Sequence, residues 1–121
     1  FLWRNYRLPP SNYFKSLNQT TIMPLPTQQL RDYFRTQLVI RAWLFGSYAD
    51  GTATEESDVD ILVELDYEQH IGLSFAGMWL DLQDMLQKKV DLVTEDGVSK
   101  YIRPRIEAQK KLIYEKIIPA L

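Results

Sequence analysis

The sequence predicts an α/β (α+β) protein in which a small mixed β-sheet is flanked by helices. Short apolar runs that suit buried strands alternate with segments in which apolar residues recur at helical spacing. Such alternation is typical of a sheet packed against helices. In addition, 121 residues with a 45% apolar share are enough for one domain with its own core, but too few for two.

The first predicted elements are a helix over residues 28–37, with Thr27 as its N-cap, and a strand over residues 41–45. The helix is indicated by side chains at helical spacing, which are Leu30, Tyr33, Phe34 and Leu38. The strand is a short run rich in aromatic residues, and Gly46 ends it. These two elements open the folded part of the chain.

A turn and a second strand follow Gly46. Ser47 is expected to cap a short helical turn over residues 48–51, and residues 52–57 are expected to be a polar loop. The clearest strand pattern in the sequence covers residues 59–65. Because the connection between the first two strands is short, they are predicted to be antiparallel neighbours.

The second half of the chain continues the alternation. A helix is expected to begin at Ser74, a strand to cover residues 89–94, and a further helix to begin near Ser99 with Pro104 in its first turn. The first of these helices carries a stripe predicted to be core: Phe75, Met78, Trp79, Leu82, Met85 and Leu86. In the second, the side chains expected to face inward are Tyr101, Ile102, Ile106 and Ala108. Residues 112–114 suit either a final strand or a continuation of that helix.

Residues 1–22 are predicted to lie outside the folded domain, which then spans residues 23–121. The segment holds aromatic residues and two prolines without a clean periodicity. Three interpretations stay open, namely a non-native or upstream-translated extension, an ordered arm and a partner-binding tail. It lacks the basic start, long apolar run and cleavage site of a signal peptide.

Composition restricts the classes of function. The absence of cysteine excludes disulfides and thiolate metal sites, and a cytoplasmic location is expected. No apolar run approaches the roughly 20 residues needed to cross a membrane. The formal charge of −2 gives no sign of a nucleic-acid-binding face, and the single histidine, His70, argues against a His-based catalytic or zinc site. Lys88 and Lys89 are interpreted as solvated surface charge.

Three acids carry the chemistry that the sequence indicates. Asp58 and Asp60 stand at the start of a strand, where alternation places both side chains on one face. Asp91 lies inside another apolar strand, and a buried, unpaired carboxylate there would be costly. Two such carboxylates repel one another unless a cation lies between them. Oxygen-only ligands suit Mg²⁺ or Mn²⁺, and with Asp91 as a third ligand two metal ions can be held.

The turn at Gly46 and Ser47 suits the other half of a substrate. Glycine permits close approach of the backbone, and the free N–H groups at a helix start favour phosphate. The Ser47 hydroxyl adds one more donor. Taken alone, a Gly-Ser turn is most often only a turn. Together with the three acids, it indicates a site for metal ions and a nucleoside triphosphate.

These residues also resemble a known family. Gly46-Ser47, ten further residues, Asp58-Val59-Asp60 and the later Asp91 resemble the signature of the minimal nucleotidyltransferases of the DNA polymerase beta-like superfamily. The resemblance covers roughly residues 24–115. It implies a nucleotidyltransferase fold, two Mg²⁺ ions and ATP or another nucleoside triphosphate as donor. It further implies that Gly46 and Ser47 hold the triphosphate and that the three acids bind the metals, Asp91 at the catalytic one.

Small members of this family are often paired with a HEPN-type toxin, and the transferase resembles the antitoxin of such toxin–antitoxin pairs. The resemblance therefore implies transfer of AMP from ATP to a tyrosine of a partner protein. The small size fits this expectation, because there is little room for a second domain that would hold the acceptor.

One position departs from the family pattern, since many relatives carry Arg where this chain has Asp50. An anion in place of that cation brings the electrostatics of the triphosphate loop into question. Two alternatives therefore stay open, namely a catalytically weak module that binds a nucleotide or a partner, and a small-molecule nucleotidyltransferase of the antibiotic-modifying kind.

Overall fold

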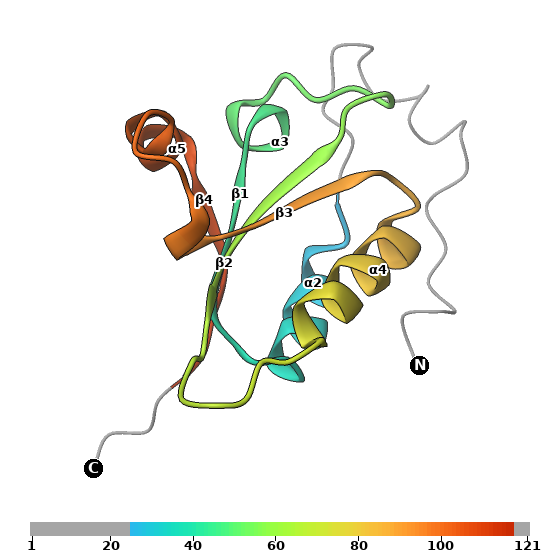
Figure 1. Ribbon diagram of the computed structural model, residues 1–121. Helices are drawn as coiled ribbons and strands as arrows, with labels where there is room; N and C mark the ends of the chain where they lie inside the picture. The colour runs from blue at the N-terminus through green and yellow to red at the C-terminus, as the bar shows by residue number, and fades with distance from the viewer. Residues whose placement is uncertain (1–24, 118–121) are drawn as a thin grey trace.

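The computed structural model describes residues 25–117, and its elements are labelled in Figure 1. Along the chain they are α2 (Thr27–Arg35), β1 (Val39–Phe45), α3 (Ser47–Asp50), β2 (Val59–Leu65), α4 (Ser74–Leu86), β3 (Val90–Thr94), the 3₁₀-helix η2 (Glu95–Gly97), α5 (Arg103–Gln109) and β4 (Lys111–Glu115). The predicted boundary between residues 22 and 23 lies outside the described range, so the extension over residues 1–22 stays a prediction.

The four strands form one mixed sheet in the order β3-β2-β1-β4. β1 is antiparallel to β2 and to β4, whereas β2 and β3 are parallel. A parallel pair needs a crossover connection, and α4 provides it between β2 and β3. The mixed sheet and the antiparallel pairing of the first two strands are thus confirmed, and residues 112–114 belong to a strand.

The two faces of the sheet are covered differently. Helices α2 and α4 lie together on one face, and α5 lies on the other (Figure 1). The alternate residues of β2 that face α2 and α4 are fully or almost fully buried, namely Val59, Ile61, Val63 and Leu65. On the opposite face Leu62 packs with Val98 and Ile106. The predicted alternation of β2 therefore holds, and its acids stand on the α5 side, which is covered only in part.

Several predicted boundaries shift by a few residues. Gly46, not Ser47, occupies the N-cap position of α3, and Leu73 precedes α4. The prediction that Tyr101, Ile102 and Ala108 face inward is wrong, because all three are exposed. α5 begins only at Arg103, so its seven residues present a single buried side chain, Ile106, to the sheet.

Candidate active site

The sheet register brings two of the predicted acids face to face. Asp60 of β2 lies opposite Asp91 of β3, and on its other side it lies opposite Phe45 of β1. Both carboxylates therefore belong to the α5 side of the sheet. Asp91 is exposed and Asp60 is half-buried. The parallel pairing of β2 and β3 is what places these two acids, 31 positions apart in the sequence, beside one another.

Burial and the repulsion between these two neighbouring acids are reflected in the pKa of Asp60. Burial, the contact with the Asp91 carboxyl and the charge of Asp58 together raise the pKa of Asp60 from 3.8 to about 6. The charge of Lys89 acts in the opposite direction. A proton shared between carboxylates relieves their repulsion, and a cation would relieve it in the same way. The pair is thus chemically suited to a hard divalent ion such as Mg²⁺.

Asp58 stands directly before β2, and its carboxylate is turned toward a lysine. Lys89 Nζ lies 3.7 Å from Asp58 Oδ2. Within residues 25–117, the three acids do not form a closed cluster of metal ligands. The structure therefore brings Asp60 and Asp91 together and places Asp58 beside them with a different partner. All three carry the oxygen donors that such an ion prefers, so their residue types fit it.

Gly46 closes the site from the β1 side. Its backbone has φ +68° and ψ −148°, a conformation that residues with a side chain rarely adopt. A Cβ atom built at Gly46 would overlap Oδ2 of Asp60. The glycine is therefore required twice, for the turn into α3 and for the space that the acid occupies.

Ser47 is the first residue of α3 and is half-buried beside this turn. The carbonyl groups of Gly46 and Ser47 accept the N–H groups of residues 49–52. Within residues 25–117 the Ser47 hydroxyl has no hydrogen-bond partner, so none of these residues competes with a phosphate oxygen for it.

The departure at Asp50 has a local structural explanation. The side chain is exposed, and its Oδ1 accepts hydrogen bonds from Thr52 N at 3.0 Å and from Thr52 Oγ1 at 2.6 Å. Gly51, between them, has φ +88°. The Asp50 carboxylate therefore stabilises the turn that leaves α3.

Lys89 is the residue of this site that sequence reasoning missed. It precedes Asp91 by two positions, so strand alternation alone puts both on one face. That spacing was the available signal. Lys89 is exposed, as its interpretation as solvated charge predicts, and it also forms a 3.7 Å ion pair with Asp58. The neighbouring Lys88 donates a hydrogen bond to the main-chain carbonyl of Glu55.

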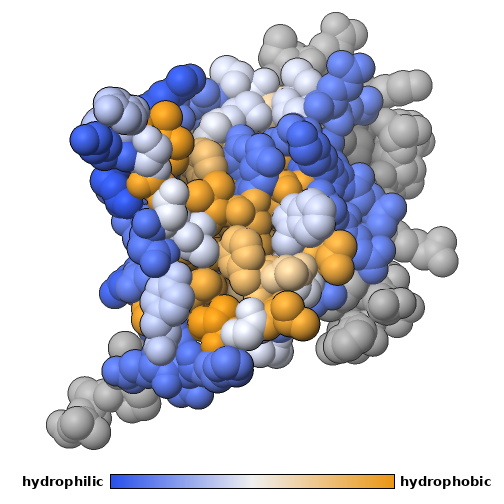
Figure 2. Space-filling view, in the orientation of Figure 1, coloured by the Kyte–Doolittle hydropathy of each residue, from blue (hydrophilic) through white to orange (hydrophobic). Residues whose placement is uncertain are grey.

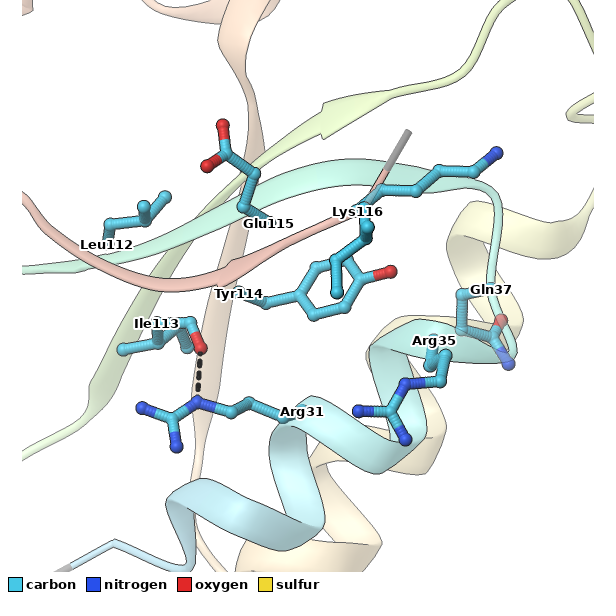
Figure 3. A pocket seen from close by; sticks show the side chains of 9 residues that line it. Arg31, Arg35, Gln37, Leu112, Ile113, Tyr114, Glu115 and Lys116 are labelled. Carbon is cyan, nitrogen blue, oxygen red and sulfur yellow. Dashed lines mark hydrogen bonds between the residues drawn. The ribbon is translucent and has the colours of Figure 1, made fainter. Parts of the chain in front are cut away.

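A larger groove, of about 590 Å³, lies at the other edge of the sheet (Figure 3). It runs between α2 and β4, and Arg31, Arg35 and Tyr114 are among the residues that line it. Arg31 Nε donates a 3.0 Å hydrogen bond to the carbonyl of Ile113. Since β1 and β2 separate β4 from β3, this groove is not part of the acid site.

The outer surface adds one observation. Figure 2 shows apolar side chains gathered in the middle of the visible face, with hydrophilic residues around them. Among the described residues, none of the helices is long and apolar enough to span a membrane.

Comparison with known proteins identifies the family. Residues 27–114 match the nucleotidyltransferase domain family. The chain is 39% identical over 90 residues to "Putative protein adenylyltransferase MJ1379" of Methanocaldococcus jannaschii, which covers 70% of this chain and 82% of the relative. It is 46% identical over 72 residues to "Putative protein adenylyltransferase MJ0128" of the same organism, covering 59% and 70%. The chain therefore belongs to the nucleotidyltransferase domain family.

Solved structures show the same fold. A chain of the crystal structure of a toxin–antitoxin with AMP-PNP superimposes with a TM-score of 0.63 at 23% identity, covering 76% of this chain and 75% of that one. A structure described as a "putative minimal nucleotidyltransferase" gives 0.53 at 29% identity, covering 70% and 83%. A chain of the complex of the tri-AMPylated Shewanella oneidensis HEPN toxin with the MNT antitoxin gives 0.52 at 20% identity, covering 74% and 73%. The predicted nucleotidyltransferase fold is confirmed.

Proposed function

We propose that this protein is a metal-dependent adenylyltransferase that moves AMP from ATP to a tyrosine hydroxyl of a HEPN-type toxin and thereby acts as its antitoxin. The observation that carries the proposal is the contact between Asp60 and Asp91, with Gly46 packed against Asp60. Two acids paired across neighbouring strands are unfavourable in an ordinary sheet, and here they stand beside the turn that carries Ser47.

In this proposal Asp58, Asp60 and Asp91 hold two Mg²⁺ ions, with Mn²⁺ as a substitute. When bound, such ions supply positive charge at the reacting oxygens and phosphates. The Gly46 turn and the Ser47 hydroxyl hold the triphosphate through hydrogen bonds. The acceptor oxygen attacks the α-phosphorus, the bond to the β-phosphate oxygen breaks, pyrophosphate leaves, and the acceptor proton passes to solvent or to an acid of the site.

The choice of a protein acceptor is supported by the relatives. Those in Methanocaldococcus jannaschii are named as protein adenylyltransferases, and the Shewanella oneidensis complex contains an AMPylated HEPN toxin with an MNT antitoxin. The described part of this chain supports it too, because residues 25–117 contain a single sheet with its helices and no second domain that would enclose a small-molecule acceptor.

The test uses ATP labelled at the α-phosphate, Mg²⁺ and the purified product of an adjacent gene. We expect label on that partner. In Asp60→Asn and Asp91→Asn the rate of labelling should fall about 100-fold or more, because each substitution removes a metal ligand. ATP labelled at the γ-phosphate should leave the partner unlabelled, which separates AMP transfer from phosphorylation.

The acceptor is identified by a second comparison. A Tyr→Phe substitution at the labelled position of the partner should abolish labelling. If no nucleotide labels the partner while the two proteins still bind one another, the chain is a binding module and the proposal is wrong. Label on an antibiotic or another small molecule in place of the partner would favour a small-molecule nucleotidyltransferase of the antibiotic-modifying kind.

A further inference from the structure

The acid site carries one cation whose role the proposed function leaves open, namely Lys89. Its ammonium lies 3.7 Å from Asp58 Oδ2, and the Lys89 side chain is 69% exposed. An ion pair so exposed to water contributes little to stability. Lys89 is therefore free to change partner at small cost, and its place in the sheet indicates which partner that is.

The sheet register fixes the position of Lys89. Val59 pairs with Val90 and Asp60 with Asp91, so the preceding residues, Asp58 and Lys89, stand side by side. The Lys89 carbonyl accepts the Val59 N–H at 3.0 Å, which anchors its backbone at this point. Lys89 and Asp91, two positions apart on one strand, share the face that carries Asp58 and Asp60.

On the β1 side of the site, the Gly46 turn lies next to the start of β2. Phe45 pairs with Asp60, and the next residue, Gly46, begins the turn at the level of Val59. The turn at Gly46 and the backbone of Lys89 thus flank β2 from its two sides. With strands about 4.8 Å apart, the two lie roughly 10 Å from one another. To reach Lys89, a triphosphate held at Gly46 and Ser47 would have to extend across this distance past Asp58.

Among the residues that the structure describes, few other cations near the Gly46 turn could contact the phosphates of a bound triphosphate. Residues 46–60 contain five acids and no Lys, Arg or His. The Gly46 turn offers only hydrogen bonds to a ligand that carries several negative charges. Lys88 is also nearby, but its ammonium donates to the Glu55 carbonyl. A shallow hollow of about 300 Å³ between the loop before β2 and the start of β3 exposes Lys89 and Asp58 to solvent.

We infer that Lys89 is a phosphate-binding residue of this site, which exchanges its contact with Asp58 for the phosphates of a nucleoside triphosphate. The inference rests on the proposed function and adds to it the cation that the position of Asp50 lacks. The exchange also releases the Asp58 carboxylate for a metal ion. Lys89 thus has opposite effects on two ligands, since it attracts the nucleotide and competes with the metal.

The test measures the two ligands separately in wild type, Lys89→Ala, Lys89→Arg and the control Lys88→Ala. AMP-PNP binding is measured by calorimetry at saturating Mg²⁺, and Mn²⁺ binding without nucleotide by electron paramagnetic resonance. For Lys89→Ala we expect AMP-PNP affinity to fall roughly 10- to 100-fold, as for a charged hydrogen bond. We expect Mn²⁺ affinity to rise by about two- to fivefold, as for loss of an exposed competing ion pair.

The other variants make the result specific. Lys89→Arg keeps the cation and should hold AMP-PNP within about threefold of wild type, because guanidinium also binds phosphate. Lys88→Ala should match wild type for both ligands. General damage to the site would weaken both ligands at once, and thermal unfolding of each variant checks that the exposed substitution leaves the fold intact.

The outcomes separate the two proposals. If wild type binds AMP-PNP and Lys89→Ala binds it equally well, or loses affinity for Mn²⁺ as well, the role of Lys89 is overturned while the proposed function stands. A wild-type protein that binds neither AMP-PNP nor Mn²⁺ overturns both. Reduced AMP-PNP affinity together with increased Mn²⁺ affinity, restored by arginine, supports the inference.

Discussion

Gly46 leaves no room for a side chain beside Asp60, because a Cβ atom at this position would overlap the carboxylate oxygen Oδ2. The turn at Gly46 that leads into α3 and the acid of β2 are thus packed directly against one another. A change at either residue is transmitted to the other.

The first prediction concerns this contact. Gly46→Ala should destabilise the fold by about 1–3 kcal/mol, because the alanine is forced into a glycine-only backbone conformation. It should also abolish AMP transfer, since Asp60 must move. Urea unfolding and the labelling assay measure the two effects. Gly77→Ala in α4 is the matched control. Its Cβ would meet nothing within 4 Å, so it should stabilise the helix by about 0.5–1 kcal/mol. Equal stability of the two variants would contradict the packing argument.

The second prediction concerns pH in the metal-free protein. The pKa of Asp60 is raised to about 6 in the folded chain, above its ordinary value of 3.8. The folded state therefore holds more protons than the unfolded state between these values, and this group's contribution to stability is lost as the pH rises through about 6. Asp60→Asn cannot lose that proton. In EDTA it should match wild type near pH 4 and exceed it above pH 6 by about 1 kcal/mol, once solvent screening is allowed for.

The measurement is urea unfolding across that pH range, analysed as the difference between the two proteins so that other carboxylates cancel. A difference that is constant with pH would show that Asp60 titrates normally. Mg²⁺ should reverse the order above pH 6, because the carboxylate pair then gains a cation that the Asn variant binds less well.

A third prediction concerns Asp50. Asp50→Asn retains the oxygen that accepts from Thr52, so it should leave the fold unchanged while removing one negative charge near the triphosphate loop. We expect the KM for ATP to fall about two- to threefold, as for one screened charge. Asp50→Ala loses the acceptor as well and should cost about 1 kcal/mol of stability. Steady-state kinetics and urea unfolding separate the two roles, and a higher KM in the Asn variant would show that the carboxylate helps binding.

The fourth prediction concerns the outer edge of β3. Trp79 Nε1 donates a 2.8 Å hydrogen bond to the Val90 carbonyl, and Gln83 Oε1 accepts the Val90 N–H at 3.2 Å. Helix α4 therefore holds the strand that carries Asp91. Trp79→Phe keeps an aromatic ring and loses the donor, so it should cost about 0.5–1.5 kcal/mol. Hydrogen exchange at β3 should become faster than at β2. Unchanged exchange at β3 would mean that the tryptophan contributes only packing.

The fifth prediction concerns the groove between α2 and β4. Arg31→Ala removes the donor to the Ile113 carbonyl and should cost about 1 kcal/mol. Arg35→Ala is the control one helical turn away. Among residues 25–117, Arg35 forms its one ion pair with the exposed Asp32, so its loss should cost less than about 0.5 kcal/mol. Comparison of their urea midpoints tests this, and similar losses would argue that the arginines act only through overall charge.

Those features of the fold that depend on a local residue pattern were predicted from the sequence. The alternation over residues 59–65 identified β2, its buried face and the shared face of Asp58 and Asp60, because period-two burial leaves a strong signal. The start of α5 was less predictable. Pro104 delays the helix until Arg103, which leaves Tyr101 and Ile102 in exposed turns.

The proximity of Lys89 to Asp58, unlike its shared face with Asp91, was hidden for another reason. Which residue stands beside Asp58 depends on the register between β2 and β3, two strands joined by a crossover helix. A register between distant strands arises from packing of the whole sheet and leaves no trace in either segment alone. The family pattern named the acids but not the neighbours that the pairing gives them.

The parallel pairing of β2 with β3 also has a consequence for how the protein is assembled. The β1–β2 pair joins neighbouring parts of the chain, whereas the contact between Asp60 and Asp91 requires closure of a connection of about thirty residues through α4. Contacts of large sequence separation form slowly, since the loop entropy must be lost before they stabilise the chain. The two acids should therefore meet late in folding. Until then the nascent protein has the Gly46 turn but no acid pair, so the activity that we propose would arise only once the fold is complete.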